Sequence, residues 1–94
     1  MTFEWDNSKN ELNKKKHDGI SFEFAVRVFL DKKRIEKYDY KHSTDKEDRW
    51  NTIEKIDDIL FIVYTERNEN IRIISARKAN TEEINEYNDN YDLR

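Results

Sequence analysis

The residues best suited to chemistry in this sequence are three arginines in its second half, Arg67, Arg72 and Arg77. The planar guanidinium group matches two oxygens of a phosphate, so grouped arginines are typical of proteins that bind or cleave nucleic acids. The competing interpretation pairs each arginine with a carboxylate such as Glu66 or Glu69, and charge alone favours it because structural ion pairs are common.

His17 has the side chain best suited to proton transfer. Imidazole has an unperturbed pKa of about 6.5, so it can give or take a proton at neutral pH. The alternative for His17 is a residue that caps the end of a helix. His42 and Asp45 suggest a metal pair only weakly, because two such residues in a predicted flexible loop usually face solvent. We expect no metal site and no cofactor.

The composition predicts one small domain over residues 1–94. Hydrophobic residues make up 35% of the chain, and the 13% that are aromatic argue against disorder. The chain has no cysteine, which excludes disulfides and thiolate zinc sites. The longest apolar run, residues 59–64, is too short to span a membrane, and the amino terminus lacks a signal-peptide pattern. We expect a soluble, cytoplasmic protein that makes no membrane contact.

The net charge of −3 argues against nucleic-acid binding, but the acids are concentrated in residues 82–94. The rest of the chain is close to neutral. The basic runs at residues 14–16 and 32–34 could attract phosphate, and on charge alone a solvated surface explains them equally well.

Local patterns predict an α+β fold with two helices near the amino terminus, an antiparallel sheet and a carboxy-terminal helix. Asp6 and Ser21 are placed to cap the first two helices, and Asn80 or Thr81 the last. The predicted helices are 7–17, 22–30 and one after residue 80, and the predicted strands are 3–5, 35–40, 48–56, 59–67 and 71–77.

The spacing of the arginines constrains their positions in this sheet. A two-residue turn after residue 67 or 68 places Thr65, Arg67 and Arg72 on one face. Arg77 then lies on the opposite face, unless a β-bulge returns it to the same one.

Several segments, in order, resemble the BrnT family of type II toxins. The resemblance covers residue 3 to about residue 88, and no single segment is specific alone. Its most specific parts are Phe3-Glu4-Trp5-Asp6, Lys16-His17 followed by Gly19, and Arg72-Ile73-Ile74-Ser75-Ala76-Arg77.

This resemblance implies a RelE-like fold and a bacterial endoribonuclease that arrests translation without a metal. It also implies a BrnA-like antitoxin with a ribbon–helix–helix domain, through which alone the complex would bind operator DNA. We predict metal-free phosphodiester transfer initiated by the RNA 2′-hydroxyl. The predicted catalytic residues are Lys16, His17, Arg67, Arg72 and Arg77, and the predicted RNA contacts are Lys9, Asn13, Lys14 and Arg49.

Two departures from the family pattern support an alternative function. Asp18 separates His17 from Gly19, and Glu54 stands where the family usually carries glycine. A bulky acid there could narrow the RNA path. The alternative is a catalytically decayed toxin fold that serves only as an antitoxin partner or co-repressor.

The second predicted helix has more apolar surface than its core stripe requires. Phe22, Ala25, Val26 and Phe29 form that stripe, and the remaining apolar residues lie beside it. Exposed apolar surface usually marks an interaction site, although burial on two sides would also explain it. The predicted antitoxin-binding residues are Phe24, Val28 and Leu30.

Overall fold

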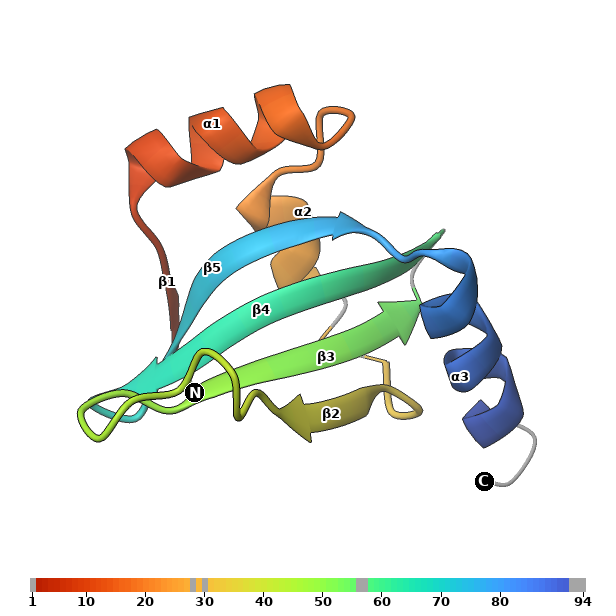
Figure 1. The fold of residues 1–94 in the computed structure, drawn as a ribbon. Coiled ribbons are helices and arrows are strands. Elements are labelled where there is room, and N and C mark those ends of the chain that lie inside the picture. Colours follow the sequence, from red (N-terminus) through yellow and green to blue (C-terminus); the bar gives the residue numbers. More distant parts are fainter. Residues whose placement is uncertain (1, 28, 30, 56–57, 92–94) are drawn as a thin grey trace.

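The computed structural model describes residues 2–27, 29, 31–55 and 58–91 (Figure 1). Its elements follow one another as a strand, two helices, four strands and a helix. Their bounds are β1 Thr2–Glu4, α1 Asn7–Lys16, α2 Phe22–Arg27, β2 Ile35–Tyr38, β3 Arg49–Lys55, β4 Ile59–Arg67, β5 Asn70–Lys78 and α3 Thr81–Tyr91.

The strands form one sheet in the order β1-β5-β4-β3-β2. Strands β2 to β5 are antiparallel neighbours, whereas β1 pairs with β5 in parallel, from Thr2 opposite Asn70 to Glu4 opposite Arg72. The prediction of an antiparallel sheet is therefore wrong in this respect, and the sheet is mixed. Only strands joined by a short turn must run antiparallel. Almost the whole chain separates β1 from β5, so no turn constrains their direction.

In Figure 1, α2 lies behind β4 and β5, α1 lies beyond the edge of β5, and α3 lies at the end of β3. The main core fills the space beneath α2. Its buried residues come from β4, β5, α2 and the segment before α2: Ile20, Phe22, Ala25, Leu60, Ile62, Tyr64, Ile71, Ile73 and Ala76. The predicted stripe of α2 is confirmed, because Phe22 and Ala25 are buried while Val26 and Phe29 pack against this core. The described part of the helix ends at Arg27, and residues 28 and 30 of the predicted helix lie outside the described residues.

Helix α1 is attached to the sheet by amide groups and not by apolar side chains. Its buried residues are Asn10 and Asn13, while Leu12 remains 50% exposed. Asn13 Nδ2 donates to the carbonyl oxygens of Ala76 (2.8 Å) and Ile20 (3.0 Å), and Asn13 Oδ1 accepts from the Ala76 backbone N–H (3.1 Å). Asn13 thus forms hydrogen bonds with backbone groups of β5 beyond the end of the pairing between β1 and β5. These bonds protect a strand edge that would otherwise be free.

We expect Asn13→Ala to lower the free energy of unfolding by about 2 to 4 kcal/mol, because it leaves buried backbone groups of β5 unpaired. Urea unfolding followed by far-ultraviolet circular dichroism measures this change. Lys15→Ala, on the exposed side of the same helix, is the control and should change stability by less than about 0.5 kcal/mol. Equal stabilities of the two variants would contradict the structural role of Asn13.

Candidate functional site

The sheet face opposite α2 carries an open groove of about 370 Å³. Strands β3, β4 and β5 form its floor, and the loop before β3 forms one side. Its lining residues are Asp39, His42, Arg49, Asn51, Phe61, Val63, Ile74, Ser75 and Arg77. We call it the sheet groove. Two arginines and a histidine lie around an apolar floor, which suits a phosphate chain with bases beside it.

A β-bulge decides which arginines share this face. Thr65 pairs with Arg72, and the register then shifts between Val63 and Tyr64, so that Phe61 pairs with Arg77. Residues directly opposite each other in antiparallel strands point to the same side. The predicted common face of Thr65, Arg67 and Arg72 is therefore confirmed, and the bulge brings Arg77 to it.

Sharing a face does not bring all three arginines into the groove. Arg67 donates to Glu47 (3.0 Å) and Arg72 to Glu4 (3.2 Å), and neither arginine lines the groove. Carboxylates thus occupy the positions that we expected phosphate to take. The guanidinium of Arg67 and the nearby Arg49 hold the pKa of Glu47 below its usual value although partial burial raises it.

Arg77 lines the sheet groove and connects β5 to α3. Its two terminal nitrogens bind both oxygens of Glu83 (2.8 and 2.9 Å), and its guanidinium stacks over the Phe61 ring at 4.2 Å. Glu83 also accepts from the Asn80 backbone N–H while Asn80 Oδ1 accepts from the Glu83 N–H, both at 2.9 Å. This reciprocal capping box confirms Asn80 as the helix cap.

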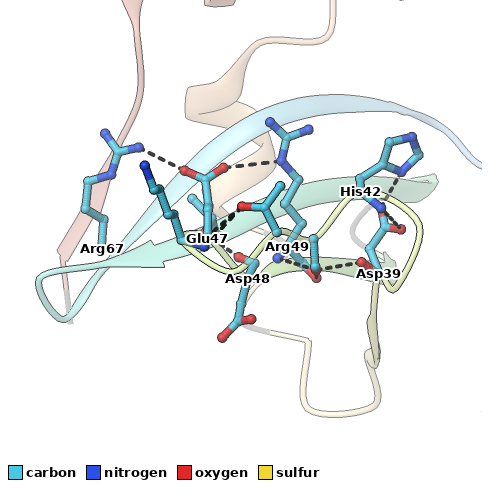
Figure 2. Close-up of polar contacts among 10 residues, drawn as sticks. Asp39, His42, Glu47, Asp48, Arg49 and Arg67 are labelled. Carbon is cyan, nitrogen blue, oxygen red and sulfur yellow. Dashed lines mark hydrogen bonds and ion pairs between the residues drawn. The ribbon is translucent and has the colours of Figure 1, made fainter.

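Arg49 is the better placed cation. Its Nε donates to Glu47 (3.3 Å), and its terminal nitrogens have no hydrogen-bond partner among the described residues (Figure 2). Those two nitrogens present the forked donor geometry that binds two phosphate oxygens.

A second, smaller groove of about 250 Å³ runs along α1. Its lining residues are Lys9, Leu12, Asn13, Lys16, His17, Ile74 and Ser75. We call it the helix groove. Because Ile74 and Ser75 line both grooves, the two meet at the bulged part of β5. The helical stripe of Lys9, Asn13 and Lys16 therefore faces the same path as Arg49 and Arg77.

His17 is the C-cap residue that directly follows α1, and it lines the helix groove beside Lys16. Asp18 and Gly19 both adopt left-handed backbone conformations, with φ of 53° and 77°. The inserted Asp18 is thus absorbed in the turn after the helix and does not lengthen it.

Two predicted RNA contacts on α1 have other partners. The Asn13 amide is buried and bonded to backbone. Lys14 pairs with Glu11 at 2.8 Å and does not line the helix groove. We assign both to stability of the fold and leave them out of the RNA site.

Two large aromatic rings of the sheet, Trp50 and Tyr64, line neither groove and are not placed to stack on RNA there. Trp50 lies opposite Tyr64 in the register, and both belong to the side packed against the core. Glu54 lies on that side too and is fully buried. Glu54 therefore lines neither groove and is not placed to narrow them.

The predicted antitoxin surface is described only in part. Phe24 is half-buried against the core, with the Arg27 guanidinium 6.0 Å from its ring centre. Val28 and Leu30 lie outside the described residues. A cavity of about 390 Å³ adjoins α2, and Phe3, Val26, Phe29, Tyr64 and Ile71 supply its apolar walls.

The structure adds a site residue that sequence reasoning set aside. His42 lines the sheet groove, and its partner is Asp39, not Asp45. The useful signal was the three-residue spacing of Asp39 and His42, which allows a carboxylate to bind the backbone and ring of the same histidine.

Two further observations concern the described residues alone. Among them, no group of three or more His, Cys, Asp or Glu side chains is arranged to hold a metal ion. No helix in the described part of the chain has the length and apolar character that crossing a membrane requires.

Comparisons with known proteins show which family the chain resembles. The family model described as "Ribonuclease toxin, BrnT, of type II toxin-antitoxin system" matches residues 5–83. The 1.1 Å crystal structure of the Brucella abortus ribonuclease toxin BrnT is similar in fold, with a TM-score of 0.61 and 24% identity over 86% of this chain and 99% of that chain. No curated protein matches the sequence. Since the family model covers most of the chain, this protein belongs to the BrnT family of ribonuclease toxins of type II toxin–antitoxin systems.

Proposed function

We propose that this protein cleaves RNA without a metal ion, along the path formed by the helix groove and the sheet groove. The observation that carries the proposal is the junction of the two grooves at Ile74 and Ser75. It places the basic side of α1 and the arginines of the sheet along one continuous surface. A single RNA strand can contact both, because cations that follow a groove bind successive phosphates.

The proposed reaction uses the RNA's own 2′-hydroxyl as nucleophile. His17, assisted by Lys16, removes the hydroxyl proton, and the oxygen attacks the adjacent phosphorus. Arg49 stabilises the negative charge that develops on the phosphate, and Lys9 holds the backbone beside it. Arg77 lines the sheet groove, but both of its terminal nitrogens bind Glu83, so it adds to the positive potential of the path without a direct contact. Arg67 and Arg72 contribute to the fold through Glu47 and Glu4.

The proposed partner is a BrnA-like antitoxin that binds operator DNA on behalf of the complex. Membership in a type II toxin–antitoxin family supports the existence of an antitoxin. The exposed part of Phe24 and the neighbouring surface of α2 are the proposed contact. Phe24→Ser should then weaken antitoxin binding while the isolated chain keeps its circular dichroism spectrum.

Cleavage of a synthetic RNA by the purified chain in excess EDTA tests the proposal. We expect products with a 2′,3′-cyclic phosphate and a 5′-hydroxyl, and no cleavage where the 2′-hydroxyl is replaced by hydrogen. Arg49→Lys should lower the rate on the order of 100-fold, because lysine cannot bind two phosphate oxygens at once.

Arg72→Lys is the matched control, since it makes the same change outside the grooves and should keep a rate close to that of the unaltered chain. Cleavage that requires added metal would contradict the metal-free reaction. Equal rates of Arg49→Lys and the unaltered chain would exclude Arg49 from the site.

The positions of both departures from the family pattern bear on the catalytically decayed alternative. Glu54 is buried on the other side of the sheet, and the turn at Asp18 leaves His17 at the end of α1. Neither departure from the family pattern closes the path between the grooves.

A further inference from the structure

The segment between β2 and β3 is held in place by hydrogen bonds, although the sequence predicted a flexible loop. The Ser43 hydroxyl donates to the Asp39 carbonyl (2.6 Å) and accepts from the Arg49 backbone N–H (2.9 Å). The Thr65 hydroxyl on β4 donates to the Asp48 carbonyl. These bonds fix both ends of the loop to the sheet, so side chains on it have defined positions.

Asp39 holds His42 at two points, as Figure 2 shows. Its Oδ2 lies 2.8 Å from His42 Nδ1, and its Oδ1 accepts from the His42 backbone N–H at 3.2 Å. The Asp39 side chain is 11% exposed and the His42 side chain 59% exposed. The carboxylate is therefore sheltered beneath an imidazole that lies open to the groove.

This arrangement determines which ring nitrogen can exchange a proton with a ligand. Burial raises the pKa of Asp39, but the hydrogen bonds from His42 outweigh this effect and hold it below its usual value. An ionised Asp39 accepts a hydrogen bond from Nδ1–H, which leaves Nε2 for proton transfer. A carboxylate that orients an imidazole also stabilises the imidazolium form.

The position of His42 complements that of His17. His42 lines the sheet groove with Arg49 and Arg77, whereas His17 lines the helix groove. The grooves share Ser75, so a phosphate placed there lies between the groove that His17 lines and the groove that His42 lines. Cleavage by a 2′-hydroxyl needs two proton transfers, one at the attacking oxygen and one at the leaving oxygen.

We propose that His42, positioned by Asp39, is the general acid of the reaction; this inference rests on the proposed RNA cleavage. As the 2′-oxygen forms its bond to phosphorus and loses its proton to His17, the bond from phosphorus to the 5′-oxygen breaks. His42 Nε2 gives its proton to that 5′-oxygen. The products are a 2′,3′-cyclic phosphate and a 5′-hydroxyl, and the two histidines have exchanged protonation states.

The first test measures cleavage of a synthetic RNA in EDTA by His42→Gln and His42→Ala. Glutamine can still donate a hydrogen bond to Asp39 but cannot transfer a proton, so the loop is retained. Both variants should lose on the order of 100-fold or more in rate. Added imidazole should restore part of the rate of His42→Ala, because the space that the exposed ring vacates is accessible to solvent. Lys41→Ala, an exposed change in the same loop, should have no effect.

The second test separates an acid from a residue that only shapes the loop. An RNA whose 5′-bridging oxygen is replaced by sulfur has a leaving group that needs no protonation, so His42→Gln should lose little rate on it. Asp39→Asn should lose rate on the normal substrate and keep most of it on the sulfur substrate, because Asp39 acts only by orienting the ring of His42 that donates the proton.

The outcomes distinguish the two proposals. If the unaltered chain cleaves RNA and His42→Gln matches its rate on the normal substrate, the role of His42 is wrong and the proposed function stands. Equal losses on the normal and sulfur substrates, without rescue by imidazole, would make His42 structural. If the unaltered chain does not cleave RNA, both proposals are wrong.

Discussion

Inducing this chain alone in a bacterial host should stop growth and deplete intact cellular RNA. The expectation follows from membership in a ribonuclease toxin family and from the continuous cationic path between α1 and the sheet. Growth curves and gel analysis of total RNA after induction measure the effect. Arg49→Lys should restore growth, whereas Arg72→Lys, which alters an arginine bonded to Glu4 outside the grooves, should remain toxic.

Co-expression of the antitoxin provides the complementary control, because growth should resume while the toxin is still present. Unimpaired growth with folded protein in the cell would contradict the ribonuclease function. It would favour the alternative in which the fold serves only as an antitoxin partner.

Glu54 should make the protein less stable as the pH rises. The side chain is fully buried, and neither carboxylate oxygen has a hydrogen-bond partner among the described residues. Burial raises the pKa of Glu54 to about 8; Asp31 and Glu36 add to the shift, and Thr52 and Arg34 oppose it. A buried carboxyl group thus keeps its proton at neutral pH because the charged form cannot be solvated.

The direction of the pH effect follows from comparing the pKa of Glu54 in the unfolded and the folded state. In the unfolded chain the pKa of this glutamate is near its ordinary value of 4.5, so the folded state binds one more proton between that pH and about 8. The free energy of unfolding is therefore greatest below pH 4.5, and it falls as the pH rises from there through the folded-state pKa of about 8. The loss by pH 9 amounts to about 3 to 5 kcal/mol.

Glu54→Gln should remove this loss, because an amide of similar shape carries no proton to lose. Urea unfolding at pH 5 and pH 9 should show nearly equal stabilities of variant and unaltered chain at the lower pH, and a more stable variant at the higher pH. Glu66→Gln, at an exposed position on β4, should leave the pH dependence unchanged. If the variant and the unaltered chain differ in free energy of unfolding by the same amount at pH 5 and pH 9, Glu54 is charged in the folded protein and the prediction is wrong.

Local signals in the sequence were sufficient for most elements. Asp6 caps α1, with its carboxylate accepting from the Ser8 and Lys9 backbone N–H groups. Ser21 accepts from the Phe24 N–H at the start of α2. Such caps act within three residues, and the apolar patterns of β3 to β5 act along single strands, so both are visible without the fold. The BrnT family resemblance was likewise carried by residue order alone.

The composition of the site depended on contacts between distant segments. No local pattern shows that Asn13 would bind the edge of β5, or that β1 would pair with β5 in parallel, because each contact joins opposite ends of the chain. The β-bulge at Ile74 selected the face of Arg77. The sequence left that choice open, since one extra residue in a strand reverses the direction of every side chain beyond it.

The sequence by itself determined the family, the helices and strands, and the residue types available for RNA cleavage. Only the tertiary structure decided which of these residues face a common path. It placed Glu54 in the core, gave Arg67 and Arg72 carboxylate partners, and brought His42 to the groove through Asp39. Side-chain chemistry is a property of each residue, but the partner that a charged group finds depends on strand register and on loops that close across the sheet.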